Sequence, residues 1–275
     1  MKNFIWIILM ILNCLPIYGQ NNFMEKVKEL KRGKEINKKF TDTYLPEEVK
    51  ANAEYSTLTS AGQIDFEQDE ILLLIEENSG ICSNMTIISY NVEGELIDHL
   101  QIREDCDADI SLPYYDAFDY EIYSSLNLIE IEYYEERIKD TTLIDARTGY
   151  LKDFASLINN ETVERKYFQY YTLNENGSFK ELTVDTVKHN ERLYPETSFR
   201  VLWSGDFLNK DKKELRIMRN EIFAAHGYIF NSKDLNEYFN KHDWYKPESK
   251  EVSEKLTDIE KINLQIILER EKEIR

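Results

Sequence analysis

The segment from residue 215 to residue 230, LRIMRNEIFAAHGYIF, decides the fold of the C-terminal part of the chain. Apolar residues recur in it at the spacing of one helical stripe, namely Leu215, Met218, Ile222 and Ala225. Gly227 permits the left-handed backbone that commonly ends a helix. The segment therefore predicts an amphipathic helix with His226 in its last turn and Gly227 as its cap.

Two more helices are predicted after it. A helix from about Lys233 to Lys241 places Leu235, Tyr238 and Phe239 on one side. Thr257 and Glu260 have the spacing of a capping box, and the helix they begin has a predicted stripe of Ile259, Ile262, Ile266 and, more loosely, Arg270. Residues 199–275 are thus predicted to form a small helical domain.

This region resembles the YARHG domain. The resemblance covers about residues 215–269, and the matching positions are Leu215, Arg216, Arg219, Asn220, Glu221, Ile222, Ala224, His226, Gly227, Phe230, Leu235, Tyr238, Phe239, Trp244, Tyr245, Pro247, Glu260 and Asn263. Phe223 and Ala225 stand where the motif has tyrosine and arginine, so one hydroxyl and one guanidinium are missing here. The resemblance implies an extracellular bacterial module whose biochemical activity is not established.

Residues 68–190 have the pattern of an antiparallel β domain, with short runs rich in Ile, Leu, Tyr and Phe between turn residues. Predicted strands cover Glu70–Ile75, Thr86–Val92, Leu96–Ile102, Asp119–Ser124, Leu128–Tyr134, Thr142–Asp145, Lys166–Leu173 and Phe179–Val184. The turns 147–149 and 174–177 favour a meander of hairpins. The fold class is therefore α+β, and the pattern leaves open whether the β domain is barrel-like or a sandwich.

Two cysteines of this domain are equally distant from a predicted hairpin turn. Cys82 and Cys106 are each twelve residues from Gly94, so a regular hairpin would place them opposite each other. In an oxidising compartment such a pair favours a disulfide. Two buried free thiols remain the alternative, since the register of a hairpin can slip.

Residues 1–20 resemble a secretory signal peptide. Lys2 precedes an apolar run from Phe4 to Leu12, and a cut is expected near Gly19 or Gln20. The run is shorter than the ~20 residues that cross a bilayer, so we expect no integral membrane association after cleavage and a periplasmic or secreted protein. Cys14 is expected to be lost with the leader. Residues 21–67 are predicted to be a polar, loosely packed lead-in with one short helix.

The formal net charge of −18 argues against nucleic acid as a partner, because phosphates would be repelled. We expect no cofactor. A component of the cell wall or envelope, or another envelope protein, is the expected partner.

The expected ligand-binding candidates are Arg219, Asn220, Glu221, His226, Trp244 and Tyr245. One interpretation is a polar pocket that recognises a carboxylate, a sugar or a peptide. The other is structural, with Arg219 and Glu221 tying helices together and His226 interacting with the helix dipole. Under the second interpretation, the aromatic residues from Phe223 to Tyr245 form the core.

Motifs of catalysis are missing from the sequence. Neither His-Glu-x-x-His nor Gly-x-Ser-x-Gly occurs, and the cysteines are unavailable as nucleophiles if they are paired. A zinc site with His226 and His242 has no third ligand at a suitable spacing. Asp105, Asp107 and Asp109 alternate as calcium ligands do, although Ile110 occupies the position of the loop glycine.

The sequence thus favours a non-catalytic binding or interaction protein of the bacterial envelope. Two alternatives differ from it in class: a cell-wall-processing enzyme or accessory, and a calcium-stabilised structural protein.

Overall fold

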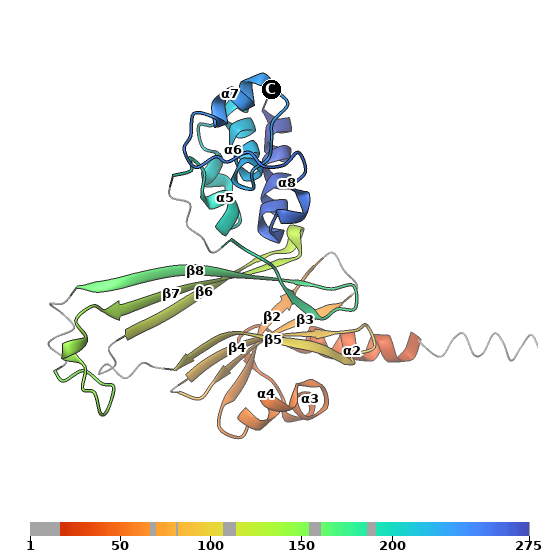
Figure 1. Ribbon diagram of the computed structural model, residues 1–275. Helices are drawn as coiled ribbons and strands as arrows, with labels where there is room; N and C mark the ends of the chain where they lie inside the picture. The colour runs from red at the N-terminus through yellow and green to blue at the C-terminus, as the bar shows by residue number, and fades with distance from the viewer. Residues whose placement is uncertain are drawn as a thin grey trace, which may run out of the picture. The chain divides into compact units, whose positions relative to one another are not determined.

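The computed structural model describes residues 17–66, 70–80, 82–106, 114–153, 161–185 and 191–274 (Figure 1). It has antiparallel sheets in its N-terminal part and helices in its C-terminal region, which confirms the α+β prediction. The chain divides into two compact units. Unit 1 comprises residues 1–167 and 171–180, and unit 2 comprises residues 168–170 and 181–275.

The first sheet of unit 1 is a meander in which each strand pairs with the next along the chain. Its strands are β1 (Lys34–Glu35), β2 (Thr57–Ile64), β3 (Ile71–Asn78), β4 (Cys82–Tyr90) and β5 (Leu96–Cys106). Both faces of β3 are covered, because four consecutive residues, Leu72 to Ile75, are all buried. Leu73 and Ile75 belong to one core cluster and Leu72 and Leu74 to another, as the two-residue period of a strand requires.

Three helices cover one face of this sheet: α2 (Ile17–Glu29), α3 (Lys38–Tyr44) and α4 (Glu47–Asn52) (Figure 1). Phe23, Val27, Phe40, Leu45 and Val49 are buried against the Leu73 side of β3. The expectation of a loosely packed lead-in is therefore wrong for this segment. Its apolar residues are few and far apart in sequence, but they converge once β1 and β2 join the sheet.

The second sheet consists of β6 (Tyr114–Tyr123), β7 (Leu128–Ile138), β8 (Thr162–Leu173) and β9 (Phe179–Glu181), in that order. Ile129, Ile131 and Leu173 share a core cluster with the Leu72 side of the first sheet. Over the described residues unit 1 is thus layered, with two separate sheets around a common core.

The prediction of a strand at Thr142–Asp145 is wrong. Thr141–Leu143 is a single 3-10 turn that the Asp140 carboxylate begins by accepting a hydrogen bond from the Thr142 amide at 2.9 Å. Only Ile144 forms a bridge, to Leu151. The short polar side chain competes with strand pairing for the local amide.

Cys82 and Cys106 are Cα partners on neighbouring strands, as predicted. The route to this register differs from the prediction. Tyr90 pairs with Leu96, so the turn is centred on Glu93 rather than Gly94. Two irregularities then advance β5 by two residues relative to β4 and bring the cysteines opposite each other.

Unit 2 contains α5 (Glu196–Phe199), α6 (Lys212–Ala225), α7 (Lys233–Phe239) and α8 (Asp258–Glu273). Leu215, Met218 and Ile222 of α6 are buried in its core as predicted, whereas Ala224 is buried in place of Ala225. The predicted capping box of Thr257 and Glu260 begins α8.

Gly227 ends α6 as predicted, with a φ of +77°. The Tyr228 amide donates to the Phe223 carbonyl at 3.1 Å, and the Gly227 amide donates to the Ala224 carbonyl at 3.0 Å. These two bonds are those of a Schellman motif, which satisfies the last carbonyls of the helix.

The buried face of α8 differs from the predicted stripe. The buried residues of α8 are Ile259, Glu260, Asn263 and Ile267, whereas Ile262 and Ile266 of the predicted stripe are only partly buried. A stripe chosen by apolar residues alone misses this face, because two of its four members are polar.

Candidate functional site

Five polar residues of unit 2 form a connected network in its interior. We call this set, Arg192, Ser198, Glu221, His226 and Glu260, the buried polar cluster. Arg192 precedes α5, and the other four lie on α5, on α6, at the C-terminal cap of α6 and on α8. All but His226 are at most 5% exposed, so the network depends on its own partners for hydrogen bonds.

Arg192 and Glu221 form the charged centre of the cluster. The Arg192 Nε lies 3.2 Å from Oε1 of Glu221, and both side chains are 1% exposed. The same carboxylate accepts bonds from the amides of Leu193 and Tyr194, at 3.2 and 2.8 Å. A buried carboxylate with three donors is well satisfied, and removal of its partner would leave an uncompensated charge.

Ser198 links this pair to Glu260. Its Oγ accepts from Nη1 of Arg192 at 2.7 Å and donates to Oε1 of Glu260 at 2.6 Å. A serine nucleophile needs a base that receives its proton and an open approach for the substrate. Here the hydroxyl is bound to an arginine and a carboxylate and is 2% exposed, so its geometry is that of a structural bridge.

Glu260 is fully buried and joins α8 to the end of α6. Its Oε2 lies 2.7 Å from Nε2 of His226 and accepts from the Thr257 amide at 2.9 Å. Burial alone would raise the pKa of Glu260, but the hydrogen bonds from His226 and Ser198 outweigh it and lower the pKa below its ordinary value. The carboxylate is therefore held in its charged form.

Asn263 of α8 binds the backbone of α5 and of the loop that follows it. Its Oδ1 accepts from the Leu202 amide at 2.9 Å. Its Nδ2 donates to the carbonyls of Thr197 and Arg200, at 2.9 and 2.7 Å. The amide thus clamps a loop whose backbone groups would otherwise be buried without partners.

The structure places three of the predicted site residues in contacts between elements of unit 2 and a fourth in a contact within α6. Arg219 pairs with Glu271 of α8 at 2.8 Å. Asn220 donates to the Arg216 carbonyl at 2.7 Å, while Glu221 and His226 belong to the buried polar cluster.

The aromatic residues Trp244 and Tyr245 pack against Phe239. Tyr245 is buried and donates to the Tyr228 carbonyl at 2.6 Å. The predicted aromatic core is confirmed, because Phe223, Tyr228, Phe230, Tyr238, Phe239, Trp244 and Tyr245 form one packed cluster.

Sequence reasoning missed Arg192 and Ser198, and it identified Glu260 as a capping residue and a matching position of the domain but not as a member of a buried network. Arg192 and Glu221 are separated by 29 positions, so no local motif connects them. One signal was available. Glu260 and Asn263 interrupt the apolar face of α8, and a polar residue on a buried face needs a buried partner.

One large apolar side chain of unit 2, that of Trp203, is exposed to solvent. Trp203 is 60% exposed, and its indole lies against Gly205, where a Cβ atom would be 2.4 Å from the ring. The Trp203 amide donates to Asp206 at 2.9 Å, and Arg200 contacts both oxygens of that carboxylate, at 2.9 and 2.6 Å. The ring is thus accessible, and hydrogen bonds fix the backbone beneath it.

Metal sites receive no support from the described part of the chain. Within it, no group of three His, Cys, Asp or Glu residues is arranged to hold an ion. Asp107 and Asp109 of the possible calcium loop lie outside the described residues, as does the side chain of Asp105. Among the described residues, moreover, no helix has the length and apolar character to cross a membrane.

Comparison with protein families matches the YARHG domain to residues 191–272. The match begins one residue before Arg192 and so includes the whole buried polar cluster. It confirms the resemblance found in the sequence, and it suggests an extracytoplasmic protein. Comparisons with curated proteins and with solved structures gave no match.

Proposed function

We propose that this protein is a non-catalytic binding protein of the bacterial cell envelope, and that unit 2 recognises its partner. The YARHG match supports a location outside the cytoplasm. The apolar run from Phe4 to Leu12, with a cut near Gly19 or Gln20, supports export.

The exposed indole of Trp203 is the observation that carries this proposal. Tryptophan is enriched among the residues that dominate binding energy, and its large ring supplies apolar area that a partner can cover. Ser198 and His226 are the residues that most resemble a catalytic pair, and each of them bonds to the buried carboxylate of Glu260 rather than to the other. These contacts favour a scaffold that displays a surface over a site that performs a reaction.

A retention experiment tests the proposal. Exported full-chain protein is mixed with purified peptidoglycan and with envelope extracts, and the bound fraction is measured by sedimentation. Trp203→Ala is compared with Tyr55→Ala, which removes an exposed aromatic side chain from unit 1. We expect retention of the parent and of Tyr55→Ala, and at least a fivefold loss for Trp203→Ala.

Equal retention of both variants would refute recognition through Trp203. Release of soluble cell-wall fragments during the incubation would refute the non-catalytic proposal and favour the cell-wall-processing alternative.

A further inference from the structure

An open groove of about 790 Å³ lies in unit 1 where β2 begins and β3 ends. Its lining combines one aromatic side chain, that of Tyr55, with hydroxyl, amide and carboxylate groups. The volume is within the range that is typical of small-molecule sites. The groove therefore has room for a small ligand.

Two neighbouring rungs of the sheet bring four of the lining side chains together. Thr57 is the Cα partner of Asn78, and Thr59 is the Cα partner of Glu76. Residues two apart on a strand face the same side of the sheet, and the buried Leu58 between the threonines faces the other side. The four side chains thus start from an area of about 5 by 7 Å on one face, which is comparable to the size of a hexose ring.

These four side chains have unused capacity for hydrogen bonds. Among the described residues, the side chains of Thr57, Thr59 and Glu76 have no hydrogen-bond or ion-pair partner. Oδ1 of Asn78 accepts from the Gly80 amide at 2.8 Å, which orients the side-chain amide and leaves its Nδ2 without a partner in the same part of the chain. A ligand in the groove therefore meets two hydroxyl groups, a carboxylate and an amide donor.

Tyr55 supplies the aromatic surface of the groove. It is 82% exposed, and its hydroxyl group has no partner among the residues that the structure describes. The Tyr55 amide donates to the Asn52 carbonyl at 2.9 Å, so the end of α4 fixes the backbone beneath the ring. Tyrosine is enriched among the residues that dominate binding energy. A sugar ring has a face of C–H groups that can pack on such an aromatic ring.

The composition of the lining indicates the class of ligand. Among the described residues it contains two carboxylates, Glu54 and Glu76, and neither lysine nor arginine, so an anion would be repelled. It also contains no purely aliphatic side chain there, which disfavours a ligand that is apolar on all sides. We propose that this groove binds a neutral saccharide, with the C–H face of one sugar ring on Tyr55 and its hydroxyl groups bonded to the four side chains of the two rungs.

Isothermal titration calorimetry of the exported full-chain protein tests this site with three neutral probes, maltotriose, cellotriose and mannotriose. Trigalacturonic acid is the anionic match, and the glucosamine trisaccharide, whose amines are protonated, is the cationic match. The test variants are Tyr55→Ala, which removes the ring, and Thr59→Val, which removes a hydroxyl group and keeps the shape of the side chain. Tyr150→Ala is the control, because Tyr150 is an exposed tyrosine of unit 1 that does not line the groove.

We expect saturable binding of at least one neutral trisaccharide and none of trigalacturonic acid. Its Kd should increase at least tenfold in Tyr55→Ala and at least threefold in Thr59→Val, and less than twofold in Tyr150→Ala. Failure of all three neutral probes to bind would overturn the proposal. Binding of the glucosamine trisaccharide alone would overturn it as well, because it would assign the groove to cations. An unchanged Kd in Tyr55→Ala would exclude the groove as the site.

This site is independent of retention through Trp203. The groove belongs to unit 1 and Trp203 to unit 2, so Trp203→Ala should bind the trisaccharide with the Kd of the parent. The peptides of peptidoglycan carry carboxylates, which the two carboxylates of the groove repel. Tyr55→Ala therefore remains a control in the retention experiment, and either experiment can fail without the other.

Discussion

The buried carboxylate of Glu260 lies 2.7 Å from Nε2 of His226, which ties the first turn of α8 to the C-terminal cap of α6. The same carboxylate accepts from Ser198 at 2.6 Å. One side chain thus connects three elements of unit 2. Trp203 and Trp244 both belong to this unit, and the third tryptophan, Trp6, lies in the leader expected to be removed. Tryptophan fluorescence of the exported protein therefore reports on unit 2.

Substitution of Glu260 by glutamine is expected to destabilise unit 2 by about 2–4 kcal/mol, because a buried charged acceptor is replaced by an amide that cannot accept all of its bonds. Urea unfolding followed by tryptophan fluorescence measures the change. Glu269→Gln, at an exposed position of the same helix, is the matched control and should change stability by less than about 0.5 kcal/mol. Similar values for the two variants would contradict a structural role for Glu260.

Acid is expected to weaken unit 2 through the same residue. The pKa of Glu260 is lowered in the folded state, so its stabilising effect is complete above about 4.5, the ordinary value, and is lost as the pH falls through the folded pKa. Midpoints of urea unfolding between pH 7 and pH 3 should decrease below pH 4.5 in the parent and in Glu269→Gln. Glu260→Gln should show a shallower decrease, and an identical slope in all three proteins would disprove this linkage.

Arg192 and Glu221 are expected to be strongly coupled. Loss of either charge alone, by Arg192→Met or Glu221→Met, should cost about 3–5 kcal/mol because the other remains buried without its partner. The double variant should lose clearly less than the sum of the two, since it contains no unpaired charge. A double-mutant cycle on urea unfolding gives the coupling energy, and additive losses would exclude it.

Gly227 is required for two separate reasons. Its φ of +77° is unfavourable for other residues, and a Cβ atom there would lie 2.8 Å from the Lys246 carbonyl oxygen. Gly33 has a similar φ of +71° but open space around it. Gly33→Ala should therefore cost about 1–2 kcal/mol, and Gly227→Ala should cost more. Scanning calorimetry of the whole chain compares them, and equal costs would exclude the steric contribution.

Cys82 and Cys106 are expected to form a disulfide in the exported protein. Their Cα atoms are partners across β4 and β5. Under denaturing conditions a thiol reagent should label neither residue until a reductant is added. The double variant Cys82→Ser, Cys106→Ser should unfold at a lower temperature than the oxidised parent and at about the temperature of the reduced parent. Labelling of both thiols without reduction would instead support two free cysteines.

Helices that begin with a cap and end at a glycine could be predicted from local sequence. Asp211 and Thr257 begin α6 and α8 with capping boxes, and Gly227 ends α6. The segment from α2 to β2 could not, because its core residues, Phe23, Phe40 and Leu58, are separated by long polar stretches. Their burial depends on strand pairing between residues distant in sequence, which leaves little periodic trace in so short a window.

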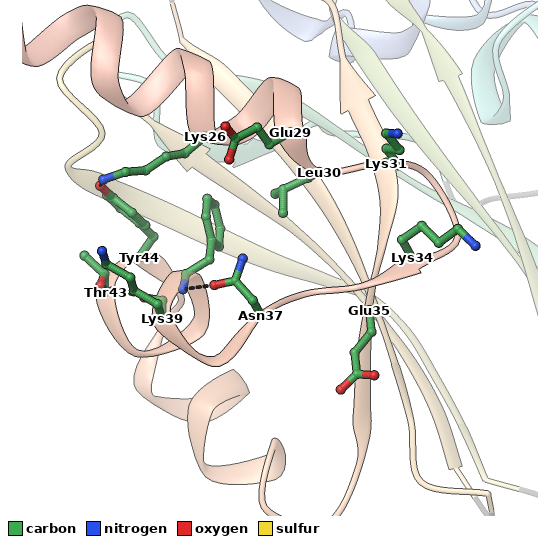
Figure 2. Close-up of a pocket in the computed structure, with 11 residues that line it drawn as sticks. Lys26, Glu29, Leu30, Lys31, Lys34, Glu35, Asn37, Lys39, Thr43 and Tyr44 are labelled. Carbon is green, nitrogen blue, oxygen red and sulfur yellow. Dashed lines mark hydrogen bonds between the residues drawn. The ribbon is translucent and has the colours of Figure 1, made fainter.

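The candidate site was predictable only in part for a similar reason. Glu221 and His226 are visible within the α6 motif, but Arg192 and Ser198 come from a segment without a recognisable pattern of its own. A pocket lined by residues of α2, β1 and α3 (Figure 2) likewise combines separate elements that no local pattern connects.

The buried polar cluster bears on what similarity to this domain implies about function. Several residues that match the domain hold α6, α8 and the preceding loop together, namely Glu221, His226, Glu260 and Asn263. Two proteins with the same residues at these positions therefore share the architecture of the domain, but they need not share a ligand. Trp203 is not among these residues, and its side chain is 60% exposed rather than part of the interior. Proteins that carry the domain are therefore expected to diverge in what they recognise while remaining identifiable as relatives.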